Sequence, residues 1–357
     1  MTDASVKPIA FDLQAWAADV NSGFLFHAAR ARGIAADQVE FRPRRSVPLQ
    51  LWLRLRIGRR VYMHRKAVIY CRRGFLRRRW RHVNGKALHV TGNKHIVNEH
   101  LRQAGYSVPE GRLFSRSEIG AAREFFLSLG GDACIKPTNG LKGAGVVPHI
   151  SDMLHFEQAF SSAGNAFENI LVEQSVRGSA VRFMFVGGEL VATRLDRPAS
   201  VVGDGTATVA ELVALRNEAT IAAGLPIWSP IIMDAEADRM LAMAGLTRGS
   251  VPGPDMRVFL RATSNIPTGA DGIGCPPGLH PGYADRVRRA VEAIPDLVIT
   301  AVDVMIADPG APATDSNHWI LDVNSAPGIA NFHVVREGAS QDVAGAIIDW
   351  LVAESSS

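Results

Sequence analysis

Short apolar runs broken by polar turns mark much of the chain, and two of these runs lie near its C-terminal end. The first covers residues 300–306, and the second covers residues 318–328 and stops at a proline and a glycine. Successive side chains of a strand point to opposite faces, so Asp322 and Asn324 share one face of the second run. The polar segment between the runs predicts a hairpin, which would bring Asp303 to the same place. We therefore expect three oxygen-bearing side chains to meet at one spot.

Helical and strand-like patterns alternate along the rest of the chain. Apolar residues follow Gly92 at positions i, i+4 and i+7, which predicts a helix there. A Ser or Thr precedes a Glu by three residues at two places, a spacing that predicts a helix start. These places are Ser115–Glu118 and Thr208–Glu211. The polar stretch that ends near Ala244 is expected to be mobile. This mixture predicts an α+β protein of three layered subdomains.

A length of 357 residues suits two or three packed subdomains better than one core. We expect a basic N-terminal mixed α/β domain over residues 1–88, a second unit over 89–172 and a third over 173–357. No apolar stretch is long enough for a membrane span, and the first ten residues lack the layout of a signal peptide, so a cytoplasmic protein is expected. The three cysteines are far apart, which indicates neither a disulfide framework nor a zinc site.

Positive charge is concentrated in one early part of a chain whose formal net charge is only +4. The arginines there are Arg42, Arg44, Arg45, Arg54, Arg56, Arg59, Arg60, Arg65, Arg72, Arg73, Arg77, Arg78, Arg79 and Arg81. Such a surface attracts nucleic acid, anionic peptides or acidic small molecules. Apolar residues interleave with these arginines, as in strands with one wet face. This favours a solvated basic face, or a site for an acidic substrate, over a dedicated RNA surface.

A phosphate-binding pattern begins at Lys136, which ends an apolar run. The glycine-rich loop 140–145 follows and holds Lys142 and Gly143. Glycines let backbone amides approach phosphate oxygens, and lysine adds a compact positive charge. A strand followed by a glycine-rich turn is also commonplace, so this pattern is weak on its own. It does not match the P-loop motif, which occurs nowhere in the chain.

Further charged residues stand at the ends of predicted elements. Glu173 ends a predicted strand, and the apolar strand pattern stops near Val176. A hinge there, with exposed backbone groups, would hold an adenine ring. A salt-bridged strand-end Glu explains Glu173 equally well. Lys94, Arg182 and Arg261 are individually typical of surface charges. Together with the acidic cluster they are what a nucleoside triphosphate and Mg²⁺ require.

Seven segments occur in an order that resembles a known family. They are GNKHIVNEHLRQAGYSVPEG, CIKPTNGLKGAGV, LVEQSVRGSAVRFMFVGGELVA, RPASVVGDGTATVAEL, RATSNIPTGA, TAVDVMI and WILDVNSAPG. Their order and spacing resemble those of the ATP-grasp ligases over residues 90–350. The similarity is greatest to the ATP-grasp part of cyanophycin synthetase and to the glutathione-synthetase half of the bifunctional glutathione enzyme. It implies an ATP-grasp fold, in which two α+β subdomains clasp ATP, and a single ligase activity. The basic first domain resembles no family that we can place.

The resemblance implies a role for each candidate residue. It makes Lys94, Lys136, Lys142 and Gly143 contacts to ATP phosphates, and Glu173 and Val176 contacts to adenine. It makes Asp303, Asp322 and Asn324 the Mg²⁺ ligands, and places Arg182, Arg261 and Asn265 near the phosphates, acyl group or acceptor substrate. Three departures from the family pattern stand out. Ala180 replaces an acidic residue near the ribose, Asp322 replaces the commoner Glu, and Pro267 and Ala270 alter the acceptor loop.

The implied reaction is ADP-forming amide or peptide bond formation through an acyl phosphate. It would join an amino acid to another amino acid, a peptide or a small amine, and the basic domain would suit an acidic substrate. Members of the family are commonly homo-oligomers. Two alternatives are a ligase that modifies a peptide or protein terminus, and a catalytically weak ATP-grasp protein whose arginine-rich domain binds RNA. Nucleic acid is the less favoured partner, because the three metal-ligand residues are all present.

Overall fold

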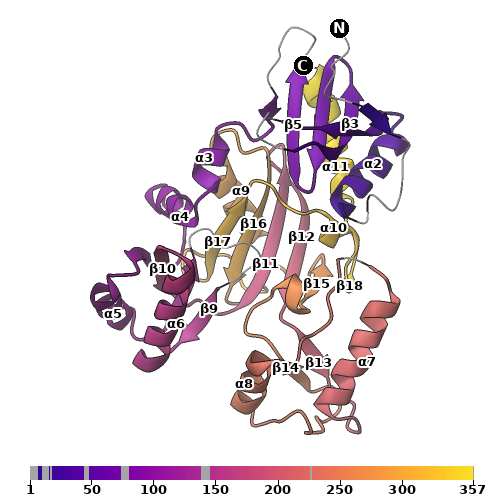
Figure 1. The fold of residues 1–357 in the computed structure, drawn as a ribbon. Coiled ribbons are helices and arrows are strands. Elements are labelled where there is room, and N and C mark those ends of the chain that lie inside the picture. The colour runs from indigo at the N-terminus through magenta and orange to yellow at the C-terminus, as the bar shows by residue number, and fades with distance from the viewer. Residues whose placement is uncertain are drawn as a thin grey trace.

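The computed structural model describes residues 7–9, 16, 18–43, 48–73, 80–137, 145–225 and 227–356. Strands and helices are mixed along the whole of this part, so the predicted α+β class is confirmed. Figure 1 shows an elongated molecule in which a central sheet lies between an N-terminal sheet, a four-stranded sheet and a small two-stranded unit.

The N-terminal sheet is an antiparallel meander whose six strands follow one another in chain order. Its strands are β1 (Lys7–Ile9), β2 (Ala35–Phe41), β3 (Gln50–Ile57), β4 (Arg60–Arg65), β5 (Val68–Arg73) and β6 (Arg81–His82). Alternate β3 residues Leu53, Leu55 and Ile57 are buried in one core cluster with α2 (Val20–Ala31) and the C-terminal helix α11 (Val343–Ser356). Arg54 and Arg56 occupy the alternating positions and contact Asp37. The predicted strand alternation is therefore confirmed here.

A four-stranded sheet with the order β7-β10-β8-β9 forms the middle unit. Its strands are β7 (Gly111–Ser115), β8 (Ala133–Pro137), β9 (Val147–Ile150) and β10 (Asn169–Gln174), and its core is shared with α5 (Ile119–Ser128) and α6 (Met153–Ala166). The capping box expected at Ser115 is wrong. The helix begins one turn later, because Glu118 takes the N-cap position and accepts the Ser115 backbone N–H at 2.7 Å.

The central sheet has the order β17-β16-β11-β12-β15-β18. Its strands are β11 (Ser179–Val186), β12 (Glu189–Arg197), β15 (Asp271–Gly274), β16 (Ile299–Ile306), β17 (His318–Asn324) and β18 (Glu337–Gly338). Apolar residues on one face of β11 and β16 pack with α3 (Ala87–Thr91), α4 (Lys94–Gln103) and α9 (Gly282–Glu292). On the other face, Met184, Ala192 and Ala301 join the core of the N-terminal sheet. The remaining part of that second face is free to line a cleft.

A small unit lies next to the edge of the central sheet that β15 and β18 form, below these strands in Figure 1. It contains β13 (Ser200–Val202), β14 (Arg257–Phe259), α7 (Val209–Ala222) and α8 (Ala235–Met243), while η1 (Ile266–Thr268) and α10 (Ala330–His333) lie in the flanking connections. The expected capping box at Thr208 is confirmed. The polar stretch up to Ala244 contains α7 and α8, and its expected mobility stays a prediction. Some of its apolar residues, among them Val213, Ile231 and Leu241, are buried in a core of their own.

The β11–β12 turn contacts the C-terminal helix through one glycine of a pair. A Cβ on Gly187, whose φ is 62°, would lie 2.4 Å from Trp350 Cδ1, whereas a Cβ on Gly188, whose φ is 85°, would meet nothing within 4 Å. Gly188→Ala is therefore expected to cost about 1 kcal/mol of left-handed strain. Gly187→Ala should cost about 1–3 kcal/mol more from overpacking. Urea unfolding of both variants measures the difference, and equal losses would show that α11 does not restrain the turn.

No helix in the described ranges is long and apolar enough to cross a membrane.

Candidate active site

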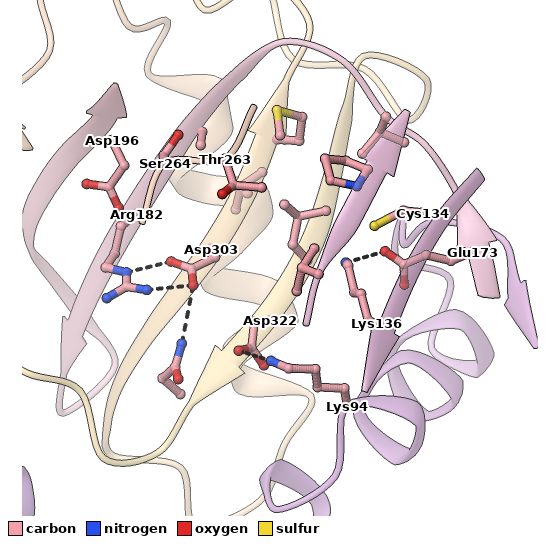
Figure 2. Close-up of a pocket in the computed structure, with 18 of the residues that line it drawn as sticks. Lys94, Cys134, Lys136, Glu173, Arg182, Asp196, Thr263, Ser264, Asp303 and Asp322 are labelled. Carbon is pink, nitrogen blue, oxygen red and sulfur yellow. Dashed lines mark hydrogen bonds and ion pairs between the residues drawn. The ribbon is translucent and has the colours of Figure 1, made fainter. Parts of the chain in front are cut away.

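A cleft of about 550 Å³ opens where the central sheet faces the four-stranded sheet. Strands β8 and β10 supply one wall, β11, β16 and β17 supply the other, and the loop 262–265 closes a third side. Figure 2 shows charged side chains from these elements pointing into the same space. Nine of the predicted residues line it: Lys94, Lys136, Glu173, Val176, Arg182, Asn265, Asp303, Asp322 and Asn324.

The hairpin that carries the acidic cluster is confirmed. Asp303 and Asp322 are direct partners in the antiparallel pair of β16 and β17, and the register shifts just after Asp303. Such an irregularity within a ladder changes the direction of the side chains beside it. The Asn324 amide nitrogen lies 3.4 Å from Asp303 Oδ2, so the three side chains meet at one place.

Each carboxylate of this cluster is paired with a cation from a different element (Figure 2). Arg182 on β11 binds Asp303 through two hydrogen bonds, from Nε at 2.5 Å and Nη2 at 2.6 Å. Lys94, at the first position of α4, forms an ion pair with Asp322. All four side chains are between 21% and 26% exposed, so a bound ligand can reach them.

A third ion pair lies on the opposite wall of the cleft, which is formed by β8 and β10. Lys136 on β8 pairs with Glu173 on the neighbouring strand β10, and Glu173 is almost completely buried. Glu173 Oε2 has no hydrogen-bond partner within the described part of the chain. This buried acceptor faces the cleft region and can take a donor from a ligand. Cys134 lies beside the pair, and burial raises its pKa to about 12, so it remains a thiol.

Lys136, Arg182 and Asp303 keep their charges over the ordinary pH range. Burial by itself lowers the pKa of Lys136 and Arg182, but the carboxylates of Glu173 and Asp303 raise both above their usual values. Burial likewise acts to raise the pKa of Asp303, yet Arg182 outweighs it and holds that pKa below the ordinary value. The stabilisation from Asp303 is therefore present above the ordinary aspartate pKa and is lost only as the pH falls through the lowered value.

The described residues fit a magnesium ion bound together with phosphates. They contain no group of three or more His, Cys, Asp and Glu side chains arranged to hold a metal by themselves. Two carboxylates and one amide oxygen are nevertheless what Mg²⁺ takes from a protein when phosphate oxygens and water complete its shell.

Of the other predicted residues only Arg261 is described, and it does not line the cleft. Arg261 is 5% exposed and turns away from it, because β14 ends at Phe259 and the guanidinium binds the Ile232 carbonyl and Asp234 instead. Lys142 and Gly143 lie outside the described residues, as does most of the glycine-rich loop.

Asp196 on β12 is a cleft residue that the sequence patterns missed. It stands directly across the β11–β12 pair from Ala180 and accepts hydrogen bonds from the fully buried Arg194 at 2.5 and 2.9 Å. The Gly187–Gly188 turn could have identified Asp196. If the two strands are paired outward from this turn, residue 180 is paired with residue 196 to within one residue. Thr263 and Ser264 also line the cleft. They follow an irregular stretch with no periodic signal.

Several known proteins have a sequence or structure similar to that of this chain. Cyanophycin synthetase from a Nostoc species is 30% identical over 263 residues, which are 72% of this chain and 29% of that protein. The glutathione biosynthesis bifunctional protein from Clostridium perfringens is 29% identical over 267 residues, which are 73% and 34% of the two chains. A bifunctional glutathione synthetase from Pasteurella multocida superposes with a TM-score of 0.64 at 24% identity and covers 94% of this chain and 43% of that one.

The chain belongs to the ATP-grasp superfamily. The predicted ATP-grasp fold and the family resemblance are thereby confirmed. This ATP-grasp chain spans about a third of the length of the curated relatives it matches. No family model matches the chain.

Proposed function

We propose that this ATP-grasp protein is an ATP-dependent carboxylate–amine ligase that forms an amide bond through an acyl phosphate. The observation that carries the proposal is the convergence of three cations in one cleft, each paired with a carboxylate, from two sheets and one helix. Transfer of a phosphoryl group needs fixed positive charge near the transferred oxygens, and ligation needs exclusion of water. The relationship to proteins named as synthetases supports this reaction class.

In the first step, a substrate carboxylate oxygen attacks the γ-phosphorus of ATP and the bond to the β–γ bridging oxygen breaks, which releases ADP. In the second step, an amine nitrogen attacks the acyl carbon, phosphate leaves and the amine loses a proton. Lys94, Lys136 and Arg182 neutralise the negative charge on the phosphates in both steps. Mg²⁺ held by Asp303, Asp322 and Asn324 would add further neutralisation. The present ion pairs would then exchange partners, since the cations turn to phosphate.

The other cleft residues divide between nucleotide and acceptor. Glu173 Oε2, buried and unpaired, is suited to accept the adenine amino group, and Val176 follows the same strand end. Asp196 offers a carboxylate opposite Ala180, where the family pattern has an acidic residue near the ribose. Asn265 faces the acceptor side, and Arg261 positions its loop through the Ile232 carbonyl. The glycine-rich loop 140–145 would cover the phosphates.

The test is ADP formation by the purified chain with ATP, Mg²⁺ and a matrix of amino acids, short peptides and amines. We expect at least one carboxylate–amine pair to raise ADP release well above the rate with ATP alone. Mass spectrometry should then find a product whose mass is the sum of the two substrates less one water. The expected substrates are amino acids or peptides, and acidic ones should be tried first because of the basic N-terminal sheet. ADP release that no member of the matrix stimulates would contradict the proposal.

A further inference from the structure

A second cavity, of about 320 Å³, lies at the outer edge of the central sheet. It is formed where β13, β14 and α7 meet β15 and β18, at the lower edge of the sheet in Figure 1. It shares no lining residue with the cleft. Asp271 in its wall pairs across the sheet with Arg197, one position from the Asp196 that faces the cleft. Strand alternation therefore puts this cavity behind the sheet.

Positive charge exceeds negative charge around the cavity. Its lining contains three arginines, Arg216, Arg257 and Arg336, and two acids, Asp271 and Glu337. Asp271 is bound by Arg216 at 2.8 Å and by Arg336 at 3.2 Å. Glu337 is bound at 2.6 Å by Arg197, which lies just outside the lining. Both carboxylates are thus already neutralised by other guanidinium groups, and Arg257 is left over.

Arg257 is exposed at the mouth of the cavity, and the only hydrogen bond of its side chain among the described residues is to the Ser200 hydroxyl at 3.2 Å. No carboxylate of the described ranges forms an ion pair with it. Most of the N–H donors of the Arg257 guanidinium are therefore free to bind a ligand.

The neighbouring guanidinium groups are held in place rather than solvated. Arg336 stacks over the Trp228 ring at 4.1 Å and donates to the Thr220 hydroxyl at 2.6 Å. Arg216 donates to the Gly269 carbonyl at 2.6 Å as well as to Asp271. Burial lowers the pKa of Arg216, and the positive charges of Arg336, Arg257 and Arg197 lower it further, against the opposing effect of Asp271. An additional anion would relieve this repulsion.

We propose that this cavity is a second anion site that binds a phosphate group between Arg257, Arg216 and Arg336. Planar guanidinium forks match the oxygens of a phosphate, and several of them can bind different edges of it. The cavity volume is at the lower end of the range for ligand sites, which suits a small phosphate-bearing molecule. The site does not depend on the proposed ligase activity.

Phosphate bound in the second cavity would also affect the cleft. Arg216 holds the Gly269 carbonyl at the end of the short segment that begins at Asn265, and Asn265 lines the cleft. An anion that draws on the Arg216 guanidinium competes with this hydrogen bond. The two cavities are thus connected through one side chain and one turn of 3₁₀ helix.

Calorimetric titration of inorganic phosphate into the full chain tests the site, in the presence of a saturating non-hydrolysable ATP analogue. Arg257→Gln is expected to weaken phosphate binding by about tenfold, the effect of losing one charge-assisted hydrogen bond. Arg239→Gln, which removes an arginine of the same small unit from the outer surface of α8, is the matched control and should bind like the parent chain. Glu337→Gln removes a negative charge from the wall and should tighten binding.

The unfolding midpoint of Arg257→Gln should equal that of the parent chain, because its side chain is exposed and makes one hydrogen bond. Absence of phosphate binding to the parent chain overturns the site, and so does equal binding to Arg257→Gln. The dependence on Arg257 is independent of whether the ATP analogue binds. A failure of the ligase proposal is therefore distinguishable from a failure of this one.

Discussion

Replacing Asp322 by alanine is expected to reduce ADP formation by roughly 10²–10³-fold, the range found when one group that stabilises developing charge is removed. Asp322 is one of only two carboxylates at the β16–β17 cluster, and its loss also leaves Lys94 without its partner. The fold should persist, because the side chain is 22% exposed and lies at the edge of the cleft. Initial rates and circular dichroism of the same sample measure both effects.

Two further variants sharpen this prediction. Asp315→Ala is the matched control. Asp315 lies in the β16–β17 connection, its side chain is 83% exposed, and it forms an ion pair with Arg286 of α9. Exposed pairs contribute little, so this variant should keep full activity and stability. Asp322→Glu restores the residue that the family pattern more commonly has and should retain part of the rate. If Asp322→Ala turned over ATP as fast as the parent chain, Asp322 would have to be removed from the metal site.

The cleft was predictable from the sequence wherever local periodicity fixed the direction of a side chain. Alternation in residues 318–324 puts Asp322 and Asn324 on one face, and the confirmed hairpin adds Asp303. Lys136 and Glu173 were predicted at strand ends, and each lies one residue before the end of its strand. The pairing of these two residues was not predictable, because β10 lies between β7 and β8 and this order is set by long-range contacts.

Irregular segments account for the residues whose placement could not be predicted. Arg261 follows β14 by two residues, and the direction of a side chain past the end of a strand depends on its tertiary partners. Helices α7 and α8 each bury only a few of their residues, and the core that contains these residues is assembled from parts of the chain as far apart as Ala199 and Leu260. The three arginines of the second cavity come from α7, from β14 and from the connection before β18, so no motif contains them.

Replacing Lys136 by methionine is expected to lower the free energy of unfolding by about 3–5 kcal/mol and to abolish ATP binding. The stability loss arises because Glu173 is left as an unpaired buried carboxylate. The loss of binding arises because the cation proposed to contact the phosphates is removed. Urea unfolding and titration with a fluorescent ATP analogue measure the two losses separately.

The double variant Lys136→Met with Glu173→Leu separates structure from function. Replacing a whole buried ion pair by apolar groups is often close to neutral, so the double variant should recover most of the stability that the single one loses. It should recover none of the ATP binding. Arg123→Met, which breaks a half-exposed pair with Glu157 on the surface of the same subdomain, is the control and should cost less than about 1 kcal/mol.

The single and double variants together show whether Lys136 binds the ligand or only neutralises Glu173. Recovered stability without recovered binding means that a buried charge is retained at this position for the sake of the ligand, since the fold is equally stable without it. Recovery of both would mean that Lys136 only neutralises Glu173 and that the phosphates are bound elsewhere in the cleft. A single variant as stable as the parent chain would show that water reaches Glu173 Oε2, and the assignment of that oxygen to the adenine amino group would then lose its basis.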